Sequence, residues 1–378
     1  MKITYIIPSL NEGGAEILTI AQANELVKRG VKVQIIILSD NSKLVRKLDP
    51  AITIFILNER RLRYLNIKSI FPVFKSIYRI NLSISEFSPE HIIAALPLSF
   101  LIARILKCFF KINGRVWIYH HSTEYLENPP TRLSQKIYNL LFVKILSSKK
   151  EHHLFISNAV KDDILQHEKI RNGYILHNSS RKQEIDLKER ELLFNQFKIK
   201  NKEYLLLPGT LNNRKGHLFF LKSTVDIIKS KNLKLLIVGG GYLEDDIRTF
   251  ITNHKVSDNV ILTGNLENKK LLQLVSGAYL CIIPSIIEGF GIVAVEALSV
   301  GTTILCSNSG GLPEIIKHKE TGYIFESKNE NDLKHQFEEI IDNPSLLIPP
   351  EILISEYDSR FSLQTHINNF LRIINTPD

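Results

Sequence analysis

The sequence is poor in cysteine and in long apolar runs. Its only three cysteines lie inside apolar stretches and lack the spacing of a metal site: Cys108, Cys281 and Cys306. A disulfide framework is therefore disfavoured, and we expect a reduced, cytoplasmic environment. The apolar run at residues 92–103 is interrupted by Pro97 and followed by Arg104, so it does not predict a membrane-spanning helix.

A secretory signal is not expected either. Residues 1–14 turn polar after a short apolar run, which predicts a first β-strand and no cleaved leader. We expect a cytoplasmic protein, either soluble or peripheral on the inner face of the cytoplasmic membrane.

The 378 residues exceed the usual size of a single core, so two domains are predicted. Basic charge is concentrated in the first of them. Residues 1–180 hold 25 Lys and Arg against 14 Asp and Glu, whereas residues 181–378 hold 23 against 25. The first half is therefore suited to an anionic partner.

Short strand-like runs alternate with helix-length segments along the whole chain, the pattern of parallel βαβ units. This predicts an α/β protein with two facing, doubly wound, Rossmann-like domains and a cleft between them. We place the first domain at residues 1–180 and the second at 200–345, joined by the polar stretch 181–202. A C-terminal helix at about 358–378 is expected to pack back on the first domain.

The segment EGFGIVAVEALSVG, residues 288–301, is the most informative motif. An apolar strand precedes it and a helix pattern closed by Gly301 follows, so Glu288 lies in a glycine-rich turn. Such a turn allows close approach of the backbone to a ligand, and the free amides of a helix start attract phosphate. Glu296 lies more than two helical turns later and can contact another part of a long ligand such as a nucleotide sugar. A helix with two ordinary glutamates is the alternative.

Taken together, these residues resemble the family 4 glycosyltransferases, which are retaining enzymes of the GT-B fold, and the resemblance covers nearly the whole chain. It implies that Glu288 lies beside the donor sugar and that Glu296 holds the ribose hydroxyls. The backbone around Phe290, Gly291 and Ile292 is implied to contact sugar hydroxyls and phosphate. The glycine loop GGAE, which follows the first strand, implies that the Gly13 and Gly14 amides approach the donor phosphates.

The stretch GTLNNRKG resembles the part of the family in which an arginine and a lysine neutralise the diphosphate. Lys215 matches the lysine, but Thr210 stands where arginine is usual, and Arg214 is the candidate replacement. Thr263 and Gly264 match the strand end on the base side. A catalytic histidine is implied after the fifth strand, where His120 and His121 are both available; we favour His121 because it opens the loop.

Breaking the bond between sugar and diphosphate builds negative charge on the leaving group, which fixed cations and amides can stabilise. No Asp-x-Asp pair stands at a strand end to hold a divalent ion. We therefore predict a metal-independent hexosyltransferase without a cofactor. Its donor is expected to be a nucleotide sugar, with UDP as the default because it is common in the family.

The acceptor is expected on the basic first half. Residues 60–80 mix cations with aromatic side chains, and residues 99–111 contain Arg104, Lys107 and Lys111 at helical spacing. Such mixing suits an anionic membrane surface, although a solvated helix face would look the same. The prediction is a saccharide acceptor, lipid-linked, of bacterial surface polysaccharide or lipopolysaccharide synthesis.

Other functions remain open at this stage. A nucleotide-sugar epimerase shares the fold, and the departure at Thr210 is compatible with a non-catalytic nucleotide-sugar-binding protein. A nicotinamide oxidoreductase is disfavoured, because VGGGYLEDD lacks the full glycine spacing and a properly placed acid. Nucleic acid fits the charge but not the motifs, so no nucleic-acid partner is expected.

Overall fold

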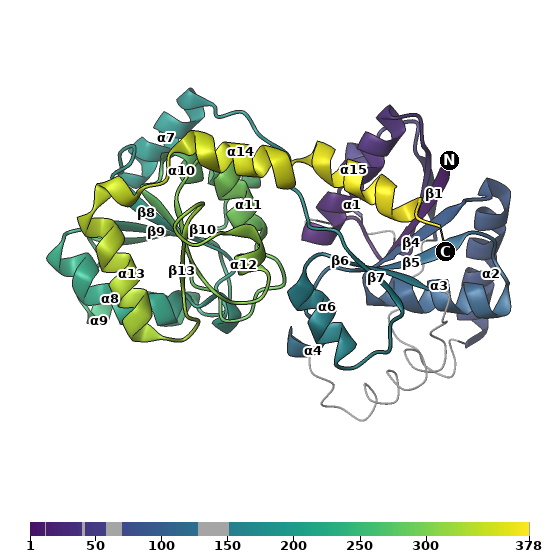
Figure 1. Ribbon diagram of the computed structural model, residues 1–378, viewed down its shortest axis with the longest axis horizontal. Helices are drawn as coiled ribbons and strands as arrows, with labels where there is room; N and C mark the ends of the chain where they lie inside the picture. Colours follow the sequence, from purple (N-terminus) through teal and green to yellow (C-terminus); the bar gives the residue numbers. More distant parts are fainter. Residues whose placement is uncertain (12, 40–41, 58–69, 128–150, 378) are drawn as a thin grey trace. The chain divides into compact units, whose positions relative to one another are not determined.

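The computed structural model describes residues 1–11, 13–39, 42–57, 70–127 and 151–377, and it has the predicted α/β architecture (Figure 1). The chain forms two compact units. The N-terminal unit comprises residues 1–178 together with 366–378, and the C-terminal unit comprises residues 179–365.

The described residues of the N-terminal unit form a seven-stranded parallel sheet of order β3-β2-β1-β4-β5-β6-β7. Its strands are β1 (Lys2–Ile7), β2 (Lys32–Ile37), β3 (Thr53–Ile56), β4 (His91–Ala95), β5 (Arg115–His120), β6 (His152–Phe155) and β7 (Asn172–Ile175). Its helices are α1 (Gly14–Lys28), η1 (Val45–Lys47), α2 (Ile70–Phe87), α3 (Pro97–Phe109), α4 (Glu124–Glu127) and α6 (Asn158–Leu165). The central strands are almost continuously buried, as expected for a parallel sheet covered on both faces.

The C-terminal unit repeats this plan with a six-stranded parallel sheet of order β10-β9-β8-β11-β12-β13. Its strands are β8 (Tyr204–Pro208), β9 (Lys234–Val238), β10 (Val260–Gly264), β11 (Leu280–Ile283), β12 (Ile304–Ser307) and β13 (Tyr323–Phe325). Its helices are α7 (Leu187–Phe197), η5 (Asn213–Lys215), α8 (His217–Ser230), α9 (Glu244–Asn253), α10 (Asn268–Gly277), α11 (Ile292–Ser299), α12 (Leu312–Ile315), α13 (Glu330–Asp342), η6 (Pro344–Leu346) and α14 (Pro350–Arg360).

The strand orders place a topological switch point in each sheet. The chain moves outward from β1 through β2 and β3 and then returns to the other side of β1, and β8 has the same place in its sheet between β9 and β11. Ligands of doubly wound sheets bind at such a point, outside the carboxyl ends of the strands. A ligand site is therefore expected at the segments that follow β8 and β11.

The last helix, α15 (Leu363–Ile374), crosses the boundary between the units, because residues up to Thr365 belong to the C-terminal unit and those from His366 to the N-terminal unit. Its later turns contact α1, where Arg29 donates from Nη1 to Oδ1 of Asn368 at 2.6 Å. The preceding helix, α14, packs on α11 instead. The C-terminal segment is thus shared between the two units.

Candidate active site

Two charged side chains meet at the switch point of the C-terminal sheet. Lys215 ends the short helix after β8, and Glu288 lies in the turn after β11. The Lys215 Nζ atom is 2.7 Å from Oε2 of Glu288, and the two side chains are 24% and 11% exposed. The structure therefore brings together two residues that the sequence motifs placed separately at the donor sugar and at the diphosphate.

Backbone contacts fix Lys215 in this position. The carbonyl of Arg214 accepts from the amides of Ile286 and Ile287 at 2.6 and 3.2 Å, which ties the turn after β8 to the turn after β11. Gly216 has φ +71°, and a Cβ atom there would lie 1.9 Å from the carbonyl oxygen of Pro284. Only glycine allows this approach, because any side chain would force the two turns apart.

The turn that carries Glu288 is held by groups that the sequence analysis missed. Ser285, which is buried, donates from Oγ to Oε2 of Glu288 at 2.9 Å. Ser309, after β12, donates from Oγ to the carbonyl of Ile286 at 2.9 Å. Gly310 has φ +56°, and a Cβ atom there would lie 1.6 Å from the carbonyl oxygen of Glu288. The glycine pair after β12 is visible in the sequence, but the carbonyl that it accommodates is not.

The predicted strand, turn and helix start are present around Phe290, Gly291 and Ile292. The helix α11 begins at Ile292 with Gly291 as its N-cap, and this N-cap residue has no side chain to bond the first amides. Phe290 is buried and meets Phe361 edge to face, with ring centroids 6.2 Å apart. The amides that open α11 are thus available to a ligand in the geometry that favours phosphate.

Glu296 lies on α11 and is 8% exposed. Its Oε1 accepts from Nδ2 of Asn268, the first residue of α10, at 2.7 Å. Burial raises the pKa of the Glu296 carboxyl to about 7, and the hydrogen bond from Asn268 opposes this shift. The carboxyl group therefore changes charge near neutral pH, where its ability to accept hydrogen bonds from a ligand also changes.

The end of β10 supplies the two candidates on the base side. Thr263 is partly buried, and its Oγ1 donates to the carbonyl of Gly264 at 3.0 Å. Asn268, the hydrogen-bond partner of Glu296, lies four residues after Gly264, so one turn connects the end of β10 to this partner. Their contact with a base stays a prediction.

Thr210 is exposed on the turn after β8, and its carbonyl accepts from the amide of Asn212 at 2.8 Å. Arg214 is partly buried, and its main chain forms the link to the turn after β11 described above. The structure thus gives Arg214 a backbone role, and its replacement of the usual arginine stays a prediction.

Gly13 and Gly14 belong to the N-terminal unit, at the switch point between β1 and β4. Gly13 is the N-cap of α1 and has no side chain with which to cap it, and Glu16 lies in the first turn. A Cβ atom at Gly14 would meet no other described atom within 4 Å, so packing within the protein does not require glycine there. At Gly13, by contrast, a Cβ atom would lie 2.3 Å from Oε2 of Glu16, so a carboxylate of the protein lies at the same helix start. Contact of the two glycine amides with donor phosphates stays a prediction.

The two histidines after β5 differ sharply in their surroundings. His120 is buried, its Nε2 lies 3.0 Å from Nδ1 of His153, and its ring stacks on Phe155. His121 packs on Tyr119, with ring centroids 4.0 Å apart, and its two ring nitrogens have no hydrogen-bond partner among the described residues. Burial, and secondarily the charge of His366, lowers the pKa of His121 to about 3. Among the described residues, His121 has both ring nitrogens without a hydrogen-bond partner, whereas in His120 this is true of Nδ1 alone.

The prediction that Arg104 belongs to a membrane-binding surface is wrong. Arg104 is buried and pairs with carboxylates inside the unit, with Nε 3.1 Å from Oε2 of Glu151 and Nη2 3.6 Å from Oε2 of Glu168. The helical spacing of Arg104, Lys107 and Lys111 suggested one exposed face, but Arg104 faces the protein interior. Residues 60–69 lie outside the described residues, as do the side chains of 70–74. None of the described helices combines the length and the apolar character needed to cross a bilayer.

Within the described ranges, no three His, Cys, Asp or Glu side chains gather as they would around a metal ion. Metal independence stays a prediction. The groups that the structure places at the candidate site are the Lys215 and Glu288 pair, the buried Glu296 and the amides that open α11.

Comparison with known proteins names the fold and the family. The model for Glycosyltransferase Family 4 matches residues 12–178, and the model for Glycosyl transferases group 1 matches residues 189–353. The chain belongs to the GT-B glycosyltransferases. The first family model ends at residue 178 and the second begins at residue 189, so each of the two compact units matches one model.

Relatives within the family are distant. An uncharacterised glycosyltransferase of Haemophilus influenzae is 25% identical over 350 residues, which cover 92% of each chain. Two uncharacterised glycosyltransferases of Methanocaldococcus jannaschii are 33% and 25% identical, but the chain covers only 34% and 56% of their lengths.

Solved GT-B structures superpose over the whole chain. Anabaena HepE in complex with UDP has a TM-score of 0.80 at 18% identity, with 98% of this chain and 99% of that chain covered. The lipopolysaccharide outer core galactosyltransferase WaaB has a TM-score of 0.72 at 17% identity, with 99% of each chain covered. At these identities the likeness shows the fold.

Proposed function

We propose that the protein transfers a hexose from a nucleotide-diphosphate sugar to a saccharide acceptor with retention of the anomeric configuration. The contact between Lys215 and Glu288 carries this proposal, because it places a cation and a carboxylate together at the switch point of the C-terminal sheet. A donor needs both: a positive charge for its diphosphate and an acceptor for its sugar hydroxyls.

The chemistry needs stabilisation of charge more than proton transfer by the enzyme. The bond from the anomeric carbon to the diphosphate oxygen breaks, and its electron pair leaves with the nucleotide diphosphate. The acceptor hydroxyl bonds to the same face of the sugar, and its proton passes to the leaving phosphate. Lys215 and the opening amides of α11 stabilise the phosphate charge, while Glu288 orients the sugar.

The rest of the donor follows α11. Glu296 lies about one helical turn after Ile292, whose amide opens α11, and it presents a carboxylate to the ribose hydroxyls. UDP is the proposed nucleotide. Support comes from the Anabaena relative of the same fold, which was solved with UDP.

The proposed acceptor is lipid-linked, as in bacterial surface polysaccharide or lipopolysaccharide synthesis, and the protein binds it at an anionic membrane surface. The support lies on α2 and α3, where Tyr78 and Leu82 are about half exposed and Phe109 is 70% exposed. The cations Lys75 and Lys111 are exposed as well. Apolar side chains next to cations suit the headgroup region of anionic lipid.

A donor-consumption screen tests the transferase. Purified protein is mixed with UDP-, GDP- and ADP-sugars, with and without a bacterial membrane extract, and the released nucleotide is measured. Release that requires the extract and is lost in Glu288→Ala supports transfer to a membrane-borne acceptor. Release without any acceptor would favour the epimerase or a hydrolase instead.

Thr210 supports a second candidate, a nucleotide-sugar-binding protein without turnover. It is exposed where the family usually has an arginine, so one positive charge for the leaving group is missing from that position. Donor binding without consumption under any condition of the screen would favour this candidate.

The membrane surface is tested separately, by sedimentation with vesicles of phosphatidylglycerol and phosphatidylcholine. We expect Phe109→Ser and Lys111→Ser to weaken binding to the anionic vesicles, with Lys222→Ser on the C-terminal unit as a matched control. Equal sedimentation of all variants would contradict the proposed surface.

A further inference from the structure

Glu296 has only one of its two carboxylate oxygens engaged within the protein. Its Oε1 accepts from Asn268 at 2.7 Å, whereas no hydrogen bond to Oε2 is present among the described residues. Glu296 is nevertheless buried, with only 8% of the residue exposed. A buried carboxylate with one free oxygen is expensive to leave unpartnered, because burial removes the water that would otherwise solvate it.

The amide of Asn268 is itself held in one orientation. Its Oδ1 accepts from Nε2 of Gln183 at 2.8 Å, so its Nδ2 is the atom that points to Glu296. Three side chains thus form a line, in which Gln183 donates to Asn268 and Asn268 donates to Glu296. Such a chain fixes the direction of each group better than a single bond would.

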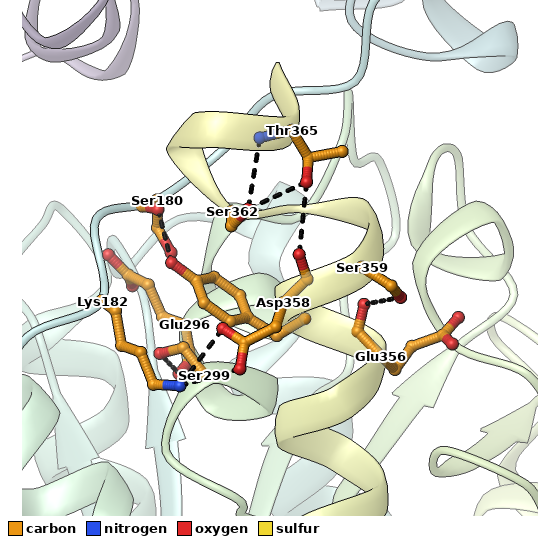
Figure 2. A network of polar contacts seen from close by, with 10 residues as sticks. Ser180, Lys182, Glu296, Ser299, Glu356, Asp358, Ser359, Ser362 and Thr365 are labelled. Atoms are coloured by element: carbon orange, nitrogen blue, oxygen red, sulfur yellow. Dashed lines mark hydrogen bonds and ion pairs between the residues drawn. The ribbon is translucent and has the colours of Figure 1, made fainter. Parts of the chain in front are cut away.

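The start of this line is anchored to the unit. Gln183 lies on the segment that enters the C-terminal unit at Ser179. This segment is tied to α14: Tyr357 donates from its hydroxyl to the carbonyl of Ser180 at 2.8 Å, and Lys182 Nζ lies 2.9 Å from Oδ2 of Asp358. Figure 2 shows these contacts together with Glu296, whose helix α11 packs on α14.

We propose that Asn268 is a positioning residue of this site, whose amide holds Oε1 of Glu296 so that Oε2 accepts the ribose hydroxyls of the donor. The inference rests on the proposed nucleotide-sugar function and names a residue that none of the motifs includes. Asn268 does not touch the reacting atoms. It acts through Glu296 by fixing the carboxyl group and by favouring its charged form.

The electrostatics of Glu296 make this role measurable. The pKa of Glu296 is raised to about 7 by burial and is held from rising further by the Asn268 bond. On β11, Cys281 faces the same region, and burial, with a smaller contribution from Glu296, raises the pKa of its thiol. On α14, Asp358 is paired with Lys182, and Glu356 with Arg360 and Lys317. Loss of the Asn268 donor is therefore expected to raise the pKa of Glu296.

The test is a calorimetric titration of the full chain with UDP, GDP and ADP between pH 6 and pH 9. Wild-type affinity is expected to fall below about pH 7, because the protonated carboxyl group accepts hydrogen bonds less well. For Asn268→Ala we expect about tenfold weaker binding at pH 7, since a hydrogen bond to a charged group is lost. Most of this loss should disappear at pH 9, where the carboxyl group is ionised without its donor.

Three comparisons separate positioning from a structural role. Asn268→Asp is isosteric but places a second carboxylate beside Glu296, so binding below pH 8 should be weaker still. The 2′-deoxy form of the nucleotide should lose less affinity in Asn268→Ala than the ribose form does. Lys270→Ala, an exposed change on the same helix, should reproduce the wild-type pH profile.

A pH-independent loss in Asn268→Ala, or unchanged affinity at every pH, would overturn the inference. If Glu296→Gln also leaves nucleotide affinity unchanged while the donor is still consumed, the inference fails and the proposed function stands. If no nucleotide binds and none is consumed, the proposed function fails, and the inference fails with it.

Discussion

Lys215 and Glu288 are 73 residues apart in the sequence, and their side chains are in contact, with Nζ 2.7 Å from Oε2. They follow two adjacent strands, β8 and β11, which pair in parallel at the switch point of the sheet. The contact joins the two functions expected of a donor site in one place. If Lys215 binds the donor diphosphate as proposed, the phosphate competes with Glu288 for the Lys215 ammonium group.

Replacement of Lys215 by Met should lower kcat for donor consumption about 100-fold or more, because a fixed charge at the leaving group is removed. Nucleotide affinity should fall as well. The measurement is steady-state nucleotide release, with Lys222→Met, an exposed lysine of α8, as the matched control. Equal rates for both variants would place the charge stabilisation elsewhere, with Arg214 as the next candidate.

Gly310 should tolerate no side chain. An alanine at φ +56° with its Cβ 1.6 Å from the Glu288 carbonyl must displace the turn, which we expect to destabilise the protein by roughly 1–3 kcal/mol. Gly14→Ala is the contrast, because its Cβ meets no described atom within 4 Å. Calorimetry should show a lower melting temperature for Gly310→Ala alone.

Titration of Gly14→Ala with nucleotide tests the predicted phosphate contact. Gly14→Ala should weaken binding without loss of stability, if its amide approaches the phosphates. Unchanged binding in that variant would remove Gly14 from the donor site.

Arg104 should be important for stability and not for membrane binding. Its removal leaves Glu151 and Glu168 buried without this cation, a situation that typically costs about 3–5 kcal/mol. Arg104→Met should therefore lower the melting temperature far more than Arg171→Met, a change of an exposed arginine. A similar melting temperature for the two variants would contradict the buried ion pairs.

Stability should fall as the pH drops from 7.5 to 5. Burial lowers the pKa of His217 to about 4, and that of His366 to about 4 as well. The unfolded chain binds protons below its ordinary pKa of about 6.5, while the native state does not, so each such histidine costs up to about 1.4 kcal/mol per pH unit in this window.

His217→Leu should therefore reduce the dependence of melting temperature on pH between 7.5 and 5, whereas Lys222→Ala on the same helix should keep the wild-type slope. An unchanged slope in His217→Leu would show that His217 is protonated in the native state at the lower pH.

Much of the fold follows from local patterns. Buried β-branched runs at regular intervals, with helix-length segments between them, indicate two parallel sheets because each βαβ unit is specified within a short stretch of chain. The turn with Glu288 and the helix with Glu296 were likewise predicted from one fourteen-residue segment. These features depend on periodicity and on glycine positions, which a sequence displays directly.

Only the tertiary structure decided which side chains meet. Arg104 has the helical spacing of a surface cation and is buried against Glu151 and Glu168. Asn268, in no motif, holds Glu296, and Gly310 leaves room for the carbonyl of Glu288. Local sequence determines the strands, helices and turns, because their hydrogen bonds close within a few residues. The partners across the site depend on how distant turns pack against one another, where differences of about an ångström separate a hydrogen bond from no contact.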